Sequence, residues 1–418
     1  MKNMKKILAI VLVVAIVASL SVAFFGCNGD KSQTWQERRS ALEGDAAKTI
    51  KIGLITLHDS SSTYDKNFID ALDVAKANLT KAGYIVETVV KSGIDESEEC
   101  YNAASDLADA GCDMIMADSF GHEDYMIKAA KDYPEVVFCH ATGTKAHTAN
   151  VPNFFNAFAS IYEGRYLAGV AAGLKLKELY GENVSAENSV IGYVGAFTYA
   201  EVISGYTSFY LGVKSQVENA TMKVQFTGSW YDPQKEKEAA VSLINSGCKL
   251  ISQHADSMGA PTACKENNVP NITYNISTES ECAGSYVIAT RINWAPYYEY
   301  VAKNIIDVKE IKKDFVGTLN DSSVEILALG SAAAEGTQAV LNDVKAKLIS
   351  GELKVFDTSK FTVDGAAVTS YMADVDSDAE FTPDTEVVSN GVFLESVKRS
   401  APYFDLKIDG ITLINQKF

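Results

Sequence analysis

The chain repeats itself, and this repeat limits its possible folds more than any other feature. The segment LADAGCDMI, which ends at Ile115, returns as LINSGCKLI, which ends at Ile251. The apolar run IGLI from Ile52 likewise returns as IGYV from Ile191, at nearly the same separation. Self-similarity at a long, constant period indicates two copies of one folding unit. The chain is therefore expected to form two similar lobes.

Within each copy, short apolar runs alternate with segments of helical periodicity. In the first copy the apolar runs begin at Lys51, Tyr84, Asp113 and Val136, and the segments between them end at Gly or Pro. The second copy alternates in the same way over residues 190–274. This pattern predicts an α/β fold of two doubly wound parallel-sheet lobes with helices on both faces of each sheet. Small ligands in such folds bind at the carboxyl ends of the strands.

The remaining segments give the expected domain organisation. Residues 28–48 have no apolar periodicity and are predicted to be a solvated tether. Crossings between the lobes are expected near Ala157 and Asn293, and several crossings suit a hinge that closes over a ligand. The expected division is 1–27 as signal peptide and lipidation site, 28–48 as tether, 49–157 with about 293–320 as N-terminal lobe, 158–292 with about 321–356 as C-terminal lobe, and 357–418 as a C-terminal extension packing on the lobes.

The first residues have the pattern of an export signal. Three lysines precede an apolar run from Ile7 to Phe25, and Gly26-Cys27 closes the run. The segment resembles a bacterial lipoprotein signal, in which Cys27 is lipidated and becomes the first residue of the mature protein. A retained membrane anchor with an incidental cysteine is the alternative. In both cases the protein is expected at the extracytoplasmic face of the cell membrane.

Composition and missing motifs exclude several classes of function. A net charge of -17 without a basic stripe argues against nucleic acid as a partner. The chain lacks the motifs of a nucleophile elbow, a zinc protease helix and a phosphate-binding loop, so neither enzymatic activity nor a cofactor is expected. The histidines do not have metal-ligand spacing, and no metal site is expected. Disulfides are possible outside the cytoplasm, but the pairing stays open for Cys100, Cys112, Cys139, Cys248, Cys264 and Cys282.

Polar and aromatic residues gather where the expected strands end. His58 to Phe68 follows the first strand and offers carboxylates, hydroxyls, an amide and aromatic faces. SWYDP from Ser229 and QHADS from Gln253 follow strands of the second copy, where Asp232 and Ser257 could instead cap helices. In YEGRY, Arg165 could contact a ligand or form a salt bridge between the lobes. Such loops are suited to holding a small, planar, polar molecule.

Several of these segments, in this order, resemble one family. The resemblance is carried by SFG followed by KAAKDYPEVVFCHATG, by YEGRYLAGVAAG, by SVIGYVGAF with EVISGY, and by SWYDPQKEKEAA, QHADS and NWAPYY, over about residues 50–303. It points to the basic membrane protein family of solute-binding lipoproteins, which feed ABC importers and have a type I periplasmic-binding-protein fold. The resemblance implies a purine nucleoside or base as ligand, an ABC permease as partner, and attachment to the membrane through a lipid anchor. A sensor, or a binder of another small solute such as a sugar, is the alternative.

A purine has two aromatic faces and a rim of hydrogen-bond donors and acceptors, so aromatic and polar side chains together should hold it. The chain departs from the family pattern in its longer, serine-rich opening loop and at Asn275, where relatives carry acidic residues. The expected ligand-binding residues are Tyr64, Asp65, Asn67, Phe68, Ser119, Phe120, Phe197, Trp230, Asp256 and Asn275.

Overall fold

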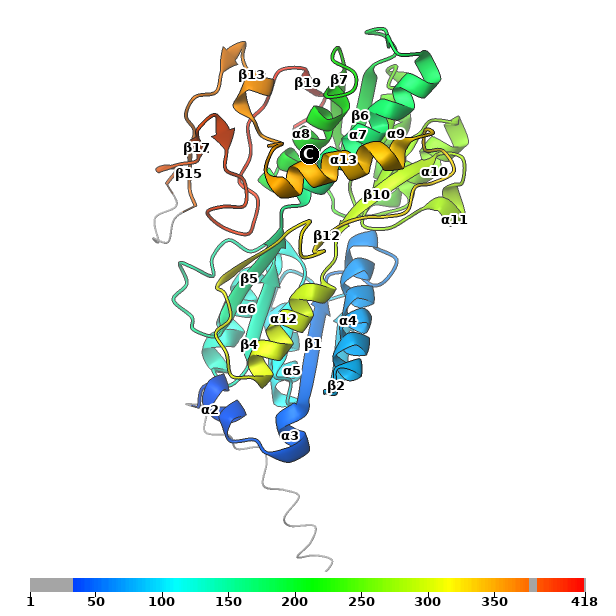
Figure 1. Cartoon of the computed structure of the whole chain (residues 1–418). Coiled ribbons are helices and arrows are strands. Elements are labelled where there is room, and N and C mark those ends of the chain that lie inside the picture. Colours follow the sequence, from blue (N-terminus) through cyan, green and yellow to red (C-terminus); the bar gives the residue numbers. More distant parts are fainter. Residues whose placement is uncertain (1–32, 376–381, 417–418) are drawn as a thin grey trace, which may run out of the picture.

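The protein consists of two lobes, one above the other, and a C-terminal extension beside the upper lobe (Figure 1). A computed structural model describes residues 33–375 and 382–416. The predicted signal peptide and Cys27 lie outside the described residues. No described helix is both long and apolar enough to cross a membrane.

The first lobe contains a six-stranded sheet in the order β11-β5-β4-β3-β1-β2, and every pairing in it is parallel. Its strands are β1 (Thr49–Thr56), β2 (Ile85–Ser92), β3 (Met114–Ala117), β4 (Val137–Ala141), β5 (Phe154–Ala159) and β11 (Asp314–Gly317). Its helices are α4 (Thr63–Lys81), α5 (Glu98–Asp109), the short η1 (Phe120–His122), α6 (Glu123–Asp132) and α12 (Ala295–Ile306).

Alternating side chains on the buried strands explain why helices cover both faces of this sheet. On β3, Met114 and Met116 pack into the apolar cluster that contains α4 and α12. Ile115 and Ala117 point the other way, into the cluster formed with α5 and α6. Successive side chains of a strand face opposite sides, so an uninterrupted apolar strand needs a helix layer on each side.

The second lobe contains a seven-stranded sheet in the order β12-β10-β9-β8-β6-β7-β19, in which only β12 runs antiparallel to its neighbour. Its strands are β6 (Val190–Gly195), β7 (Thr221–Phe226), β8 (Ile251–His254), β9 (Asn271–Tyr274), β10 (Tyr286–Ile292), β12 (Val324–Ile326) and β19 (Ile411–Leu413). Its helices are α7 (Ile161–Tyr180), α8 (Ala200–Lys214), α9 (Pro233–Asn245), α10 (Gly259–Asn267), α11 (Glu279–Cys282) and α13 (Thr337–Ser350).

The two lobes repeat one strand order. The arrangement β2-β1-β3-β4-β5 of the first sheet corresponds to β7-β6-β8-β9-β10 of the second. The predicted pair of similar, doubly wound α/β lobes is confirmed. In this topology, the order reverses beside β1 and beside β6, and ligands bind at such reversal points.

Three crossings join the lobes. The chain passes from β5 to α7 at Ser160, from β10 to α12 at Asn293, and from β11 to β12 through residues 318–323. The crossings are hydrogen-bonded to one another: the N–H of Ser160 donates to Gly317 at 2.8 Å, and that of Asn293 donates to Ser323 at 2.7 Å. Three short connections side by side allow the lobes to rotate without separating.

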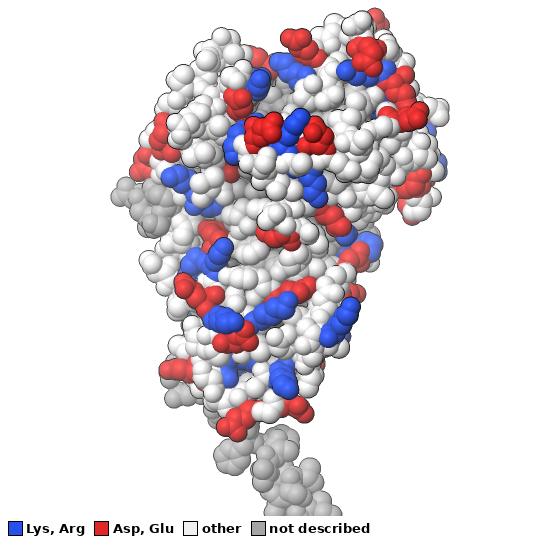
Figure 2. Space-filling model, viewed as in Figure 1, with Lys and Arg blue, Asp and Glu red and all other residues white. Residues whose placement is uncertain are grey.

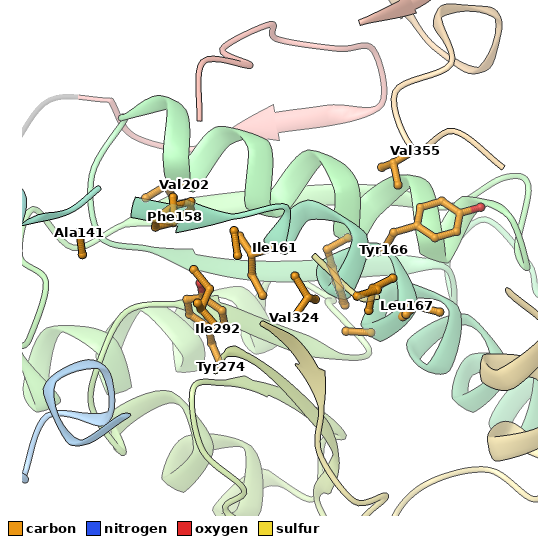
Figure 3. Packing of buried hydrophobic residues seen from close by; sticks show 14 of the residues in the cluster. Ala141, Phe158, Ile161, Tyr166, Leu167, Val202, Tyr274, Ile292, Val324 and Val355 are labelled. Carbon is orange, nitrogen blue, oxygen red and sulfur yellow. The ribbon is translucent and has the colours of Figure 1, made fainter. Parts of the chain in front are cut away.

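Apolar side chains of these crossings pack together where the lobes join. Figure 3 shows Phe158 and Ile161 from the first crossing beside Ile292 and Val324 from the other two. All four side chains are buried. The crossings therefore share one apolar core with the second lobe.

The described part of the predicted tether is folded, and that prediction is wrong for residues 33–48. Here the chain forms α2 (Trp35–Ser40) and α3 (Gly44–Lys48). Thr34 and Glu37 make a reciprocal capping box at the start of α2. This pattern can be recognised in a sequence, but the prediction of a tether considered only the lack of apolar periodicity. Trp35 is buried against the first lobe, and burying an aromatic side chain contributes roughly 2–3 kcal/mol.

The described part of the C-terminal extension, residues 357–375 and 382–416, contacts both lobes. It contains η2 (Thr358–Lys360) and three pairs of short antiparallel strands: β13 (Thr362–Val363) with β14 (Ala366–Ala367), β15 (Met372–Ala373) with β16 (Thr385–Glu386), and β17 (Val388–Ser389) with β18 (Val392–Phe393). Its last strand, β19, joins the edge of the second sheet beside β7. The N–H of Ser400 donates to the carboxylate of Asp314 on β11 of the first lobe at 2.8 Å.

All six cysteines of the described residues are buried free thiols. Cys139 lies within the apolar cluster of the first lobe, where burial raises the pKa of its thiol to about 12. Burial in apolar surroundings disfavours the thiolate, which is the reactive form.

Candidate functional site

A pocket, here called the central pocket, lies between the lobes at the carboxyl ends of their strands. It encloses about 400 Å³ of space out to its mouth, but only about 20 Å³ can hold the centre of a water molecule. Its walls therefore stand close together, and a ligand enters only if they move apart. The lining residues are Leu57, His58, Tyr64, Asp65, Ser119, Phe120, Thr142, Glu201, Trp230, His254 and Asp256.

Direct contacts between the lobes close this pocket. The backbone N–H of Thr63 in the first lobe donates to the carbonyl oxygen of Asp256 in the second at 2.8 Å. The rings of Phe120 and Tyr199 stack across the lobes with their centroids 5.5 Å apart. The structure thus represents the closed arrangement of the lobes.

The first wall of the pocket is organised by Asp65. Ser62 caps α4 and also donates its hydroxyl to Asp65 at 2.5 Å, while the backbone N–H of His58 donates at 2.7 Å. Although burial alone would raise the pKa of Asp65, its hydrogen bonds with His58 and Ser62 lower the pKa overall. The hydrogen bond with Asp65 also raises the pKa of His58. A charged carboxylate beside a protonable imidazole is the result.

A second carboxyl, Asp118, lies buried directly behind this wall. One of its oxygens accepts from the N–H of Leu57 at 3.2 Å, and the other has no hydrogen-bond partner among the described residues. Burial, together with the charge of Asp65, raises the pKa of Asp118 well above its usual value. The hydroxyl of Tyr64 donates to the backbone carbonyl of Asp118 at 2.9 Å, which fixes the Tyr64 ring at the pocket.

Aromatic rings form the second wall. Trp230 lines the pocket and meets Phe197 edge to face, with ring centroids 5.1 Å apart. Phe197 in turn stacks on Tyr199 at 5.2 Å. Asp232 caps α9, accepting from the N–H of Lys235 at 3.0 Å, which is the alternative left open by the sequence, and Trp230 still faces the pocket. An aromatic face held by other rings is a preorganised surface for a flat ligand.

Acidic groups complete the second wall. Burial, with the nearby carboxyls of Glu236 and Asp65, raises the pKa of Asp256 well above its usual value, which favours its protonated form. A protonated carboxyl both donates and accepts a hydrogen bond. Glu201 lies 3.4 Å from Nε2 of His254.

The electrostatics of the central pocket favour a ligand that donates hydrogen bonds. Its described lining contains carboxyls, hydroxyls and imidazoles but neither Lys nor Arg. A phosphate group would face carboxylates there without a cation to pair with. Within the described residues, no group of three or more His, Cys, Asp and Glu side chains could hold a metal ion.

The structure brings together Tyr64, Asp65, Ser119, Phe120, Trp230 and Asp256, all predicted from the sequence to bind ligand. The prediction requires correction for Phe68 and Asn67. Phe68 lies one helical turn below Tyr64 and stacks on Trp294 at 4.4 Å in the core. The amide of Asn67 donates to the carbonyl of Ile292 at 2.7 Å. Both side chains support the wall and do not line it.

Two further predicted residues also lie outside the lining. Phe197 packs behind Trp230. Asn275 is buried, has a left-handed backbone conformation with φ 68°, and donates its N–H to Thr290 at 3.0 Å. Asparagine tolerates this conformation better than most residues, which explains its presence there.

Arg165 serves neither of its predicted roles. Its guanidinium is buried within the second lobe, where it donates to the hydroxyls of Tyr193 at 2.9 Å and Ser252 at 2.8 Å. It also lies over the rings of Phe209 and Tyr274. Contacts with aromatic faces replace the expected salt bridge.

Sequence reasoning did not select five of the lining residues, namely Leu57, His58, Thr142, Glu201 and His254. His58, Thr142 and His254 each lie at or just beyond a strand end, so the strand-end rule could have found them. Glu201 lies in the first turn of α8 and has no such signal.

Comparisons with known proteins agree with this architecture. The family model for PnrA-like substrate-binding proteins of ABC transporters matches residues 52–359. A purine-binding protein of Brucella abortus is 30% identical over 315 residues, which cover 74% of this chain and 84% of the relative. A putative ABC transporter glucose-binding protein of Haloferax volcanii is 30% identical over 254 residues, or 61% of each chain. An ABC transporter nucleoside-binding protein of Lactococcus lactis is 25% identical and covers 60% of this chain and 66% of its own.

Solved structures show the same fold. A solute-binding protein of Aeropyrum pernix superimposes with a TM-score of 0.61 at 15% identity, covering 73% of this chain and 92% of its own. A solute-binding protein of Conexibacter woesei superimposes with a TM-score of 0.57 at 21% identity, covering 73% of this chain and 98% of its own. The expected type I periplasmic-binding-protein fold is thereby confirmed. With its repeated lobes, the pocket between them and the match over most of its length, this chain belongs to the Bmp family of PnrA-like ABC transporter substrate-binding proteins.

Proposed function

We propose that this protein captures a purine base or nucleoside between its lobes and presents it to the permease of an ABC importer, without chemical turnover. One observation carries the proposal: the central pocket combines aromatic faces from both lobes with hydrogen-bonding carboxyls and lacks Lys and Arg in its described lining. The printed functions of the Brucella abortus and Lactococcus lactis relatives support the same ligand class.

The physics of a purine matches this pocket. Tyr64 and Phe120 of the first lobe and Trp230 of the second can contact its two faces. The charged Asp65 accepts from ring or exocyclic N–H groups, while a protonated Asp256 can pair with an edge that offers both a donor and an acceptor. Aromatic residues of the pocket would thus contact the faces of the purine, and the carboxyls would bind its polar rim.

The proposal places the protein on the extracytoplasmic side of the membrane, anchored through a lipid on Cys27. Membership in a family of ABC substrate-binding proteins supports this location. Nucleic acid is not proposed as a partner, because the net charge is -17 and basic and acidic side chains are interspersed on the face in Figure 2.

Isothermal titration calorimetry with adenine, hypoxanthine, adenosine and inosine tests the proposal. At least one of them should bind, and binding should quench the fluorescence of Trp230, because Trp35 and Trp294 lie outside the pocket. Trp230→Ala should weaken binding at least about fivefold, since stacking on an aromatic face contributes about 1–3 kcal/mol per base. Trp294→Phe, in the core, is the control for changes in fluorescence.

Failure of all four purines to bind would overturn the proposal. A sugar is the second candidate, because the Haloferax volcanii relative is described as a putative glucose-binding protein. Binding of glucose or ribose in the same titrations, with no purine bound, would favour it. Incubation of the protein with inosine, followed by chromatography for hypoxanthine, should show no product; release of the base would indicate an enzyme.

A further inference from the structure

The first sheet ends in a long strand with an uncovered edge. Strand β2 is the last strand on one side of this sheet, and no described strand pairs with its outer edge. It has eight residues, whereas β11 has four and β12 and β19, the other strands at sheet edges, have three each. An edge strand presents unpaired N–H and C=O groups, and proteins commonly keep such strands short or cover them. The edge of β2 is long, and no strand in the described part of the chain covers it.

The second lobe treats the same position differently. Strand β7 corresponds to β2, and β19 of the C-terminal extension pairs with it over Ile411–Leu413. The extension thus supplies a covering strand to the second sheet, whereas its described strands do not pair with β2. The backbone groups at the edge of β2 are left for a strand from another chain.

Exposed apolar side chains surround this edge. Ile85 and Val90 on β2 are 45% and 42% exposed, and Val74 on the adjoining helix α4 is 50% exposed. Apolar side chains that gather on one part of a surface mark an interaction site. β-Branched residues of this kind also pack well in cross-strand pairs.

The backbone groups of β2 that face outward can be assigned from its neighbours. The carbonyl of Ile55 on β1 accepts from the N–H of Asp118, on the side of β3. Neighbouring residues of a strand direct their backbone groups to opposite sides, so those of Thr56 face β2. From the register of β1 with β2, the outward-facing groups of β2 belong to Val86, Thr88, Val90 and Ser92.

A second copy of β2 fits this edge when it runs antiparallel about a two-fold axis at Val89. Thr88 then lies opposite Val90 of the second copy, and their outward-facing backbone groups exchange hydrogen bonds. Glu87 lies opposite Lys91 of the second copy, at two symmetric positions. An axis at Glu87 or Lys91 would bring like charges together, and an axis at Thr88 or Val90 would pair neither charge with its opposite.

The side chains of Glu87 and Lys91 can reach such partners. Glu87 is exposed, and it lies on the same face of the sheet as Lys91 because the two are four residues apart on one strand. Nζ of Lys91 lies 2.6 Å from the carboxylate of Asp106 on α5, with 29% of the lysine side chain exposed. An ammonium group has three N–H donors, so it can bind a second carboxylate as well.

We propose that β2 is the interface of a homodimer, in which two copies of this protein join their six-stranded sheets edge to edge about an axis at Val89. Such a contact uses the same surface on both copies, so assembly stops at two. The inference is independent of the ligand that the central pocket holds.

Sedimentation velocity of the full chain in a neutral detergent tests the charge pairing. The wild type should dimerise at micromolar concentration. Glu87→Lys and Lys91→Glu each place like charges opposite one another, and each should weaken dimerisation about tenfold. An equimolar mixture of these two variants restores both opposite-charge pairs and should dimerise as the wild type does, which a misfolded variant could not do. Glu187→Lys, an equal change at an exposed position of the second lobe, is the control.

Cysteine cross-linking tests the position of the axis. Val89→Cys places two thiols opposite each other, so mild oxidation should give a covalent dimer. Thr88→Cys should not link, because diagonal neighbours lie about 7–8 Å apart, too far for a disulfide. Val397→Cys, at an exposed position of the extension, controls for random collision, and the wild type, whose six described cysteines are buried, is the blank.

Three results would overturn this interface. A wild type that stays monomeric would leave the edge of β2 to a strand of a different protein. A dimer that neither Glu87→Lys nor Lys91→Glu weakens would form through another surface. A dimer that Val89→Cys does not link would have a different register.

Discussion

At the scale of single residues, the main feature is a pair of carboxyls, Asp65 in the first wall of the pocket and Asp118 directly behind it. Asp65 is held ionised by hydrogen bonds with His58 and Ser62, whereas burial and the charge of Asp65 raise the pKa of Asp118. Two close carboxyls that cannot both ionise are pushed to opposite protonation states. The protonated member makes the folded state sensitive to pH.

We predict that Asp118→Asn stabilises the protein at neutral pH. Because the folded pKa of Asp118 is raised, its contribution to stability is fully present below the unfolded pKa near 4 and is lost as pH rises. The amide keeps an oxygen for the N–H of Leu57 and never ionises. The gain should be roughly 1–3 kcal/mol at pH 8, or about 1–4 °C in Tm, and near zero at pH 4.

Differential scanning calorimetry from pH 4 to pH 8 measures this gain. Asp73→Asn, on the exposed surface of α4, should show no such trend. A Tm difference for Asp118→Asn that stays constant over this range would mean that Asp118 is ionised in the folded protein.

At the scale of elements, the contact between α7 and α8 depends on glycines. A Cβ atom added at Gly169 would lie 2.0 Å from the carbonyl oxygen of Phe209, and one at Gly212 would lie 2.1 Å from that of Tyr166. These distances are far below van der Waals contact, and the obstructing atoms belong to the backbone. The helices can approach this closely only because both positions lack side chains.

We predict that Gly169→Ala lowers the free energy of unfolding by about 3 kcal/mol, because α7 and α8 must separate to admit the methyl group. Gly173→Ala, one turn further along α7, should cost less. There the nearest atoms to an added Cβ are Cβ of Gln216 at 2.6 Å and the carbonyl oxygen of Val213 at 3.0 Å, both further away than the 2.0 Å found at Gly169. Urea denaturation followed by circular dichroism measures both, and equal effects would contradict the close backbone contact as the cause.

At the scale of the whole molecule, the C-terminal extension ties the two lobes together. Strand β19 attaches it to the second sheet. On the first lobe, Asp314 accepts from Ser400 at 2.8 Å and lies 3.1 Å from the ring of His147. A segment fixed to both lobes must move when they separate.

We predict that Asp314→Ala frees residues 399–405 from the first lobe. Loss of a hydrogen bond to a charged group costs about 1.5–3 kcal/mol, so amide exchange there should accelerate at least tenfold. Hydrogen–deuterium exchange mass spectrometry measures this, with the strand β1 as internal reference. The Asp314→Asn variant is the control: it retains an acceptor for Ser400, so residues 399–405 should stay protected from exchange. If exchange is unchanged in Asp314→Ala, other contacts hold the extension against the first lobe.

The sequence by itself determined the two lobes, their alternating elements and most of one pocket. A repeat and an apolar period are local properties, and parallel strands bring their carboxyl ends to the same edge of a sheet, so Tyr64, Trp230 and Asp256 could be selected before any coordinates. The helix that begins at Trp35 was not predicted, because its sequence carries a cap and one buried aromatic residue but no apolar periodicity.

Only the tertiary structure decided which side chains face the ligand space. Phe68 and Asn67 point into the core because α4 packs against α12 and the crossings, and Glu201 reaches the pocket because the lobes close. The C-terminal extension likewise meets residues far away in sequence, as Ser400 does at Asp314 on β11. Such long-range contacts depend on how the helices and strands pack against one another, and no local pattern along the chain specifies this packing.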